Sequence, residues 1–354
     1  MSLDSKSIKQ TDLTIQLDKE RRTVSFDTYD MSVRQMADMF ESKLIDISPE
    51  YQRKFVWDNL RESQLIESIF LGIPVPPIFL ATNADGTWEV VDGVQRMSTI
   101  LHFCGNEKSL RDIQKPKSLV LSGLEKLSTF NNIAFTDLPK SIQTGFTLRP
   151  VKITTLNDKS DLKVRFDLFE RLNTGGVKLQ PQEIRNCIYN GKFNDFLKDC
   201  LKNEDFNKVI RMRSGSENNG TREEFALRFF AFYENYKQFD HSVIDFLNAF
   251  MQENMKKKPK PSTVANFVHT FSFLRKELPN GIVHRNRNSM TPVNLFEAIS
   301  VGVATALKQG KGLKPGIIGQ IMGEEELRRF TTGATNSRKM VVGRIEYVRD
   351  RILA

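Results

Sequence analysis

The hydrophobic pattern of this chain changes near residue 158. Before that point, strand-like and helix-like patterns alternate, whereas after it apolar residues recur at helical spacing. Two apolar runs, 78–81 and 87–91, flank a short polar turn, which predicts a β-hairpin. We therefore expect an α+β protein, with an N-terminal α/β domain over residues 1–157 and an all-helical, basic domain over residues 158–354.

Further elements of the first domain follow from spacing and from turn residues. Gly72 is well placed to end a helix, because glycine readily adopts the left-handed conformation common there. Residues 105–145 are of mixed character and define no clear element. The remaining expected elements are helices over 33–40, 65–70 and 94–103 and strands over 44–49 and 149–154.

Composition excludes several classes of protein. The 354 residues are 39% hydrophobic, yet no run approaches the length of a membrane span and the first residues lack a signal-peptide core. Three cysteines, Cys104, Cys187 and Cys200, are an odd number without CxxC spacing. We expect reduced thiols in a cytoplasmic protein, and no secreted, membrane or disulfide-rich class.

Positive charge is concentrated at the C-terminal end. Residues 251–354 carry 18 basic and 8 acidic side chains, net +10, whereas residues 1–150 have a net charge of −2. Such an excess favours a polyanionic partner, and the alternative is a solvated basic surface. Without a recognised DNA-reading helix we expect DNA backbone contacts. The candidate residues are Arg285, Arg287, Arg338 and Lys339, within a wider basic set of Arg328, Arg329, Arg344, Arg349 and Arg351.

The segment Val90–Arg96 (VVDGVQR) predicts a strand, a glycine turn and a helix start. Exposed N–H groups at such a start bind phosphate, Gly93 admits the phosphate, and Arg96 can contact its oxygens. Asp92 would position Mg²⁺ or water, and Gln95 would orient that water. The structural alternative is that Asp92 caps the helix and Arg96 is solvated.

A second cluster precedes this turn in the chain. Arg53 lies beside aromatic residues, so Arg53 could bind a phosphate while Tyr51 or Trp57 stacks on a base. The alternative is that the aromatic residues belong to the core. Further along, Asn173, Gly175 and Gly176 end a helical pattern, either as a C-cap or as phosphate-binding N–H donors.

Several short motifs occur in order between residues 51 and 186. They are YQR at 51–53, Trp57, LIESI at 65–69, GIPVP at 72–76, DGVQR at 92–96, FERLNTGG at 169–176 and EIRN at 183–186. Together they resemble the GmrSD-type N-terminal domain family over residues 30–195, a family that has a ParB/sulfiredoxin-like fold and serves in bacterial anti-phage restriction systems. The resemblance implies nucleotide binding and hydrolysis by Asp92, Gly93, Gln95 and Arg96, with Tyr51, Gln52 and Arg53 lining the same pocket.

The sequence also departs from the family pattern. Val94 stands where the family usually has a glutamine, so one polar contact to nucleotide or water is missing. The absence of cysteine from residues 1–103 excludes sulfiredoxin-like thiol chemistry. The four histidines lack the spacing of an HNH-type metal site, so we expect a separate chain to cut nucleic acid.

Together these features predict a nucleotide-binding, NTP-hydrolysing sensor or regulator of a DNA-targeting restriction-type system. The expected ligand is a nucleoside triphosphate with Mg²⁺, and the expected partners are DNA and a separate nuclease or effector subunit, with a homo-oligomer left open. The first alternative is a non-catalytic DNA-binding or scaffold subunit, and the second is a self-sufficient nuclease.

Overall fold

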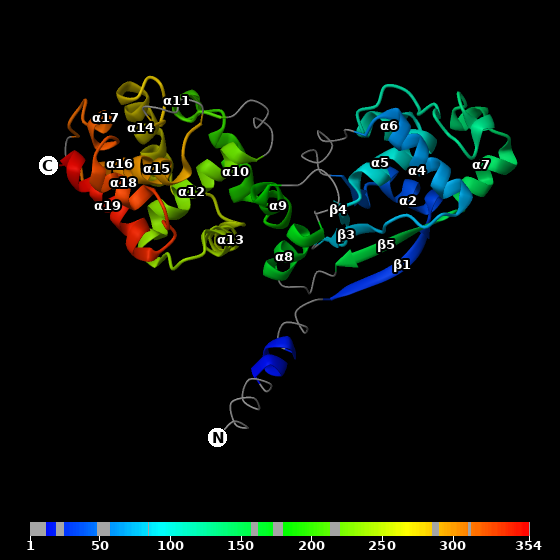
Figure 1. The fold of residues 1–354 in the computed structure, drawn as a ribbon, viewed down its shortest axis with the longest axis horizontal. Coiled ribbons are helices and arrows are strands. Elements are labelled where there is room, and N and C mark those ends of the chain that lie inside the picture. Colours follow the sequence, from blue (N-terminus) through cyan, green and yellow to red (C-terminus); the bar gives the residue numbers. More distant parts are fainter. Residues whose placement is uncertain are drawn as a thin grey trace. The chain divides into compact units, whose positions relative to one another are not determined.

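The chain folds into two compact units, unit 1 (residues 1–178) and unit 2 (residues 179–354). The computed structural model describes residues 12–18, 25–47, 57–83, 85–156, 162–172, 180–212, 220–284, 290–310 and 313–353 (Figure 1). Unit 1 contains a β-sheet with helices, and the described elements of unit 2 are helical, which confirms the predicted α+β class.

The compact units divide at a different place from the expected domains. Helix α8 (Leu162–Leu172), which follows residue 158, contacts strand β4 (Trp88–Asp92) of unit 1. The Arg165 Nη2 atom also donates to the carbonyl oxygen of Thr82, at 3.1 Å. These contacts place α8 in unit 1, so the division falls between residues 178 and 179.

A mixed five-stranded sheet forms the base of unit 1, in the order β1-β5-β3-β4-β2. Strands β3 and β4 pair antiparallel, which confirms the predicted hairpin, and β3 pairs parallel with β5. Edge strand β1 pairs antiparallel with β5, and edge strand β2 pairs parallel with β4. Besides β4, the strands are β1 (Phe26–Ser32), β2 (Ile45–Asp46), β3 (Ile78–Thr82) and β5 (Pro150–Leu156).

Helix α5 (Val94–Cys104) is the most buried helix of unit 1 and follows β4 after one residue. Its apolar side chains Met97, Ile100 and Phe103 are almost completely buried, so its start is held firmly beside the end of β4. Gly72 ends α4 with a φ of 71°, as predicted. The other elements of unit 1 are α2 (Val33–Glu41), α4 (Asn59–Leu71), α6 (Glu107–Asp112), η1 (Ser128–Phe130), η2 (Phe135–Asp137) and α7 (Lys140–Thr147).

Phenylalanine side chains form the core of unit 2. Phe229, on α12, lies with its ring centroid 5.2 Å from that of Phe267 and 5.4 Å from that of Phe271, both on α14. All three side chains are buried, which confirms these helical stripes as core. The first elements of unit 2 are α9 (Pro181–Ile188), α10 (Lys192–Cys200), α11 (Glu204–Val209), α12 (Thr221–Asn235), η3 (Tyr236–Gln238), α13 (Val243–Asn254) and α14 (Pro261–Glu277).

A buried carboxylate joins three segments of unit 2. Glu297 is fully buried at the start of the π-helical segment η4, where it accepts from Arg228 Nη1 at 2.6 Å and from Arg344 Nη2. Arg344, one of the basic residues of the C-terminal third, is therefore a core residue and not part of a basic surface. The later elements are α15 (Val293–Phe296), η4 (Glu297–Val301), α16 (Gly302–Leu307), α17 (Ile318–Ile321), α18 (Glu325–Thr331) and α19 (Arg338–Leu353).

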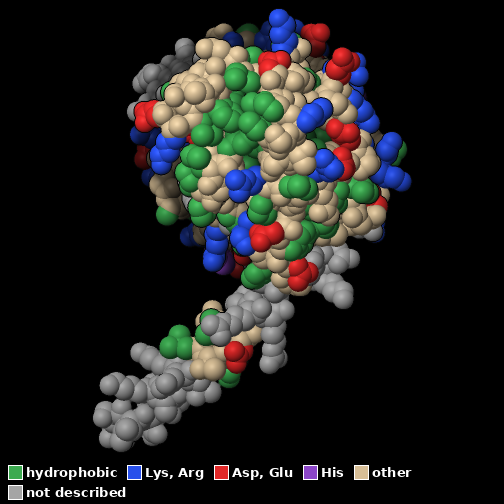
Figure 2. Space-filling view, turned by 90° about the vertical axis from the view of Figure 1, so that its right-hand side faces the viewer, with side chains coloured by type: hydrophobic (Ala, Val, Ile, Leu, Met, Phe, Trp, Pro, Cys, Tyr) green, Lys and Arg blue, Asp and Glu red, His purple; other side chains and the backbone are tan. Residues whose placement is uncertain are grey.

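The face drawn in Figure 2 is mixed in character. Figure 2 shows lysine and arginine interspersed with aspartate and glutamate, around a patch of hydrophobic side chains. Exposed large hydrophobic residues of unit 1 include Leu71, Ile73 and Leu148. Within the described ranges, no helix combines the length and the apolar character that crossing a membrane requires.

We expect Arg344→Met to destabilise unit 2 by about 3–5 kcal/mol, because it leaves the Glu297 carboxylate buried with one fewer cationic partner. Arg329→Met is the matched control. The Arg329 side chain is 66% exposed and bonds only to Glu325 and Glu326, so this change should alter stability by less than about 1 kcal/mol. Urea unfolding followed by circular dichroism measures both, and equal losses would contradict the buried-pair explanation.

The thiols should be unreactive in the folded chain. Burial raises the pKa of Cys104 to about 12 and that of Cys200 to about 12. Because the thiolate is the reactive form, Ellman's reagent at about pH 8 should leave both cysteines unlabelled until urea unfolds the protein. Mass spectrometry of the labelled peptides checks this, and fast labelling of either cysteine in the native protein would refute it.

Candidate functional site

The turn between β4 and α5 has the geometry that the sequence predicts. Strand β4 ends at Asp92, and Gly93 is the N-cap of α5 with a φ of 97°, in the left-handed region. Gly93 has no side chain, so the first N–H groups of α5 receive no side-chain cap. The alternative in which Asp92 caps this helix is therefore wrong.

Gly93 is required for space as well as for conformation. A Cβ atom at this position would lie 3.0 Å from Arg96 Nη2, 3.1 Å from Ile78 Cγ1 and 3.2 Å from Ile78 Cα. These distances leave no room for a side chain without movement of β3 or of the Arg96 guanidinium group. The glycine thus allows the start of α5 to approach β3 closely.

Arg96 connects three parts of the turn. Its Nη2 atom donates to Asp92 Oδ2 at 2.6 Å and to the carbonyl oxygen of Pro77 at 3.0 Å. The side chain is only 16% exposed, so the alternative in which Arg96 is a solvated helix residue is also wrong. The buried Nε atom of Arg96 has no hydrogen-bond partner among the residues that the structure describes. A buried donor without a partner is unusual and calls for an explanation.

Trp57 and Gln95 lie together at the same end of α5. The backbone N–H of Trp57 donates to Gln95 Oε1 at 3.3 Å, although the two residues are 38 positions apart in the chain. The guanidinium carbon of Arg61 lies 4.7 Å from the centroid of the half-buried Trp57 ring. The Arg61 guanidinium group thus covers one face of the indole ring of Trp57, beside the candidate site.

Other predicted site residues are less defined by the structure. Arg338 and Lys339 form the first turn of α19, and both side chains are exposed. Their exposure agrees with an accessible basic surface, but it does not identify what this surface binds. Eight further predicted site residues lie outside the described residues, namely Tyr51, Gln52, Arg53, Asn173, Gly175, Gly176, Arg285 and Arg287.

The described carboxylate of the turn belongs to Asp92. Asp92 contributes one carboxylate, and its Oδ2 atom is already bonded to Arg96. In the part of the chain that the structure describes, no group of three or more His, Cys, Asp and Glu side chains could hold a metal ion. A single carboxylate suits Mg²⁺ only when a phosphate group supplies further oxygen ligands.

One family of known proteins matches part of the chain. Residues 36–190 match the family described as "GmrSD restriction endonuclease, N-terminal domain", and the matched range contains the whole β4–α5 turn. These residues are therefore similar to the N-terminal domain of the GmrSD family, as their motifs predict.

Comparison with solved structures and with curated proteins says little about the function of the chain. The chain is similar to a solved structure of a Pnob8-like ParB-N domain, with 13% identity, coverage of 94% of this chain and 99% of that chain, and a TM-score of 0.24. The chain matches no curated protein. The α+β architecture is therefore defined by the strands and helices of the chain itself.

We expect Gly93→Ala to destabilise the protein more than Gly86→Ala. Both glycines have positive φ angles, 97° and 84°, so each alanine adds about 1 kcal/mol of backbone strain. A Cβ at position 86 meets nothing within 4 Å, whereas at position 93 it meets Ile78 and Arg96, which should add about 1–3 kcal/mol. Urea unfolding of both variants gives the difference, and equal destabilisation would show that close packing at Gly93 is unimportant.

Proposed function

We propose that unit 1 binds a nucleoside triphosphate at the β4–α5 turn and hydrolyses it, as a sensor or regulator in a restriction-type defence system that acts on DNA. The match to the GmrSD family supports the setting. The observation that carries the nucleotide site is Arg96, whose guanidinium group is held beside a helix start without a side-chain cap and retains a buried donor that has no partner among the described residues.

In this proposal each residue of the turn has a role. Anionic phosphate oxygens would approach the first N–H groups of α5, where Gly93 provides no side-chain cap and the helix dipole favours negative charge. Arg96 would contact the phosphates while its bond to Pro77 keeps the guanidinium group in place. Trp57, already beside Gln95, would stack on the base.

Asp92 and Gln95 would serve the hydrolytic step. When Mg²⁺ is bound, it would neutralise charge on the phosphates, with Asp92 as its protein carboxylate. Gln95 would orient the attacking water through its side-chain amide. For DNA, Arg338 and Lys339 would contact the phosphate backbone, and a separate chain would perform any cutting.

One observation favours the non-catalytic alternative. Asp92 Oδ2 and Arg96 Nη2 lie 2.6 Å apart, and the two side chains form an ion pair. This pair would stabilise the turn even if no nucleotide were bound. In that case the chain is a DNA-binding or scaffold subunit that keeps the turn for its structure. Nucleotide binding and turnover must therefore be measured separately.

We expect the wild type to bind ATP or GTP with Mg²⁺ and release phosphate, and Arg96→Ala to lower the release at least about 100-fold, because a cation that stabilises developing phosphate charge is lost. Arg34→Ala is the control, because Arg34 is exposed on α2 and its replacement removes the same charge from unit 1. Calorimetric binding and phosphate release, with and without DNA, are the measurements.

Two further variants guard against loss of folding. Arg96→Lys keeps the charge and Asp92→Asn keeps the shape of the turn, and both should fold while hydrolysing more slowly than the wild type. Binding without turnover in the wild type would favour the scaffold alternative. Binding that persists in Arg96→Ala with unchanged affinity would remove the proposed site from the β4–α5 turn.

A further inference from the structure

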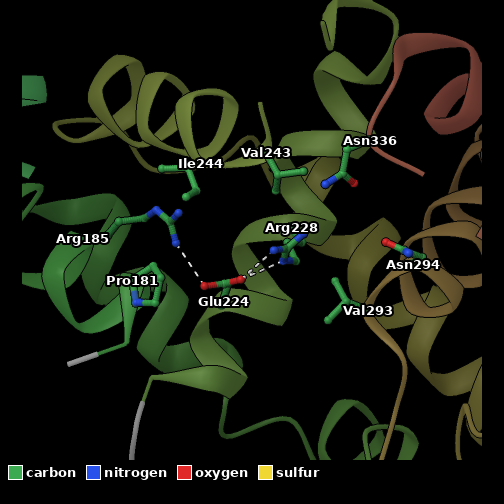
Figure 3. A pocket seen from close by; sticks show the side chains of 9 residues that line it. All are labelled: Pro181, Arg185, Glu224, Arg228, Val243, Ile244, Val293, Asn294 and Asn336. Carbon is green, nitrogen blue, oxygen red and sulfur yellow. Dashed lines mark hydrogen bonds and ion pairs between the residues drawn. The ribbon is translucent and has the colours of Figure 1, made fainter. Parts of the chain in front are cut away.

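Two groups of arginines in unit 2 line pockets and differ in their partners. The first group lines a pocket of about 320 Å³ that contains Arg185, Arg228 and Glu224 (Figure 3). Glu224 lies between the two guanidinium groups, 3.1 Å from Arg185 Nη1 and 2.8 Å from Arg228 Nη2. Burial alone would raise the pKa of Glu224, but the two arginines hold that pKa below its usual value. Arg228 also pairs with Glu297, so each guanidinium group in this pocket has a carboxylate partner within the fold.

The second group lines another pocket, of about 400 Å³, which we name the Arg211 pocket. It contains three arginines, Arg211, Arg222 and Arg275, but its lining includes no aspartate or glutamate. Nor does any of the three form an ion pair with a carboxylate of the described residues. The lining residues are Asn207, Lys208, Ile210, Arg211, Met212, Arg222, Arg275 and Pro279.

Oxygen atoms without formal charge hold these three guanidinium groups in place. Arg275 Nη1 donates to the carbonyl oxygen of Pro279 at 2.7 Å, and Arg211 Nε donates to that of the next residue, Asn280, at 3.0 Å. Arg222 Nη1 donates to the backbone oxygen of Asn207 at 3.2 Å and to its side-chain oxygen at 3.0 Å. Each guanidinium group has five N–H donors, so most donors remain for a ligand.

The backbone around the Arg211 pocket is also well fixed. Arg211 and Thr291 exchange two hydrogen bonds, from Arg211 N to Thr291 Oγ1 at 2.9 Å and from Thr291 N to Arg211 O at 3.0 Å. Ile282 N donates to Val209 O at 2.9 Å. At Gly281 a Cβ would lie 2.6 Å from that same oxygen, so the two segments approach as closely as glycine permits. The arginines are therefore presented by a framework that is already ordered.

We propose that the Arg211 pocket binds a phosphate group of a nucleic acid backbone. Three guanidinium groups that have no carboxylate partner among the described residues repel one another, and an anion relieves that repulsion. The planar N–H fork of arginine fits two oxygens of a phosphate group. The lining has no aromatic ring on which a base could stack, which favours a backbone phosphate over a mononucleotide. The site is independent of nucleotide hydrolysis in unit 1.

The test measures binding of a fluorescent DNA duplex of about 20 base pairs to the full chain at several salt concentrations. Arg211→Ala, Arg222→Ala and Arg275→Ala should each weaken binding by about threefold to tenfold and reduce the slope of log affinity against log salt by about one. Arg329→Ala is the matched control, because Arg329 is exposed in the same unit and bonds to Glu325 and Glu326. It should change the affinity by less than about twofold.

Two additional arms separate the sources of phosphate. Arg211→Lys, at the exposed position, keeps the charge, so it should fold and retain the salt slope while binding DNA more weakly. Titration with inorganic phosphate and with ATP tests a free ligand. The nucleic acid assignment would be overturned by two results together: phosphate or ATP binds in a way that depends on Arg211, and the alanine variants bind the duplex with unchanged affinity. Unchanged affinity and salt slope in folded alanine variants would overturn the site.

Discussion

A single guanidinium group determines the geometry of the β4–α5 turn. Arg96 bonds both to Asp92, at the end of β4, and to the carbonyl oxygen of Pro77, directly before β3. It therefore holds two neighbouring strands and the start of α5 in one arrangement. Gly93 makes this arrangement feasible, because a side chain there would collide with Arg96 and with β3. The uncapped start of α5, where we propose that a phosphate binds, is a consequence of these contacts.

Local chemistry explains why much of unit 1 can be predicted. The β3–β4 hairpin, α5 and the end of α4 at Gly72 follow from turn residues and apolar spacing, and all are present. Strand β1 was not predicted, because it is a polar edge strand that exposes most of its residues and depends on pairing with β5. The strand expected over 44–49 is described only as the two residues of β2, which pair with β4.

The contacts of the candidate site depend on tertiary structure. The sequence places Asp92 and Arg96 in one motif but does not show that they form an ion pair, since Asp92 belongs to a strand and Arg96 to a helix. The proline run before β3 signals an extended segment, but not that the Pro77 carbonyl would accept from Arg96. In unit 2, Arg211, Arg222 and Arg275 are scattered over more than sixty positions, so no spacing predicts the pocket they share.

Net charge alone does not identify a binding surface in this chain. Arg344 adds to the positive charge of the C-terminal third, but it forms an ion pair with the buried Glu297. Arg349 and Arg351 also form ion pairs with carboxylates. Arginines held by carbonyl oxygens keep their full charge, because a carbonyl orients the guanidinium group without neutralising it. Arg211, Arg222 and Arg275 are of this kind, and Arg96 is intermediate, with one carbonyl and one carboxylate. The partner of each arginine, and not the number of arginines, therefore indicates where an external phosphate can bind.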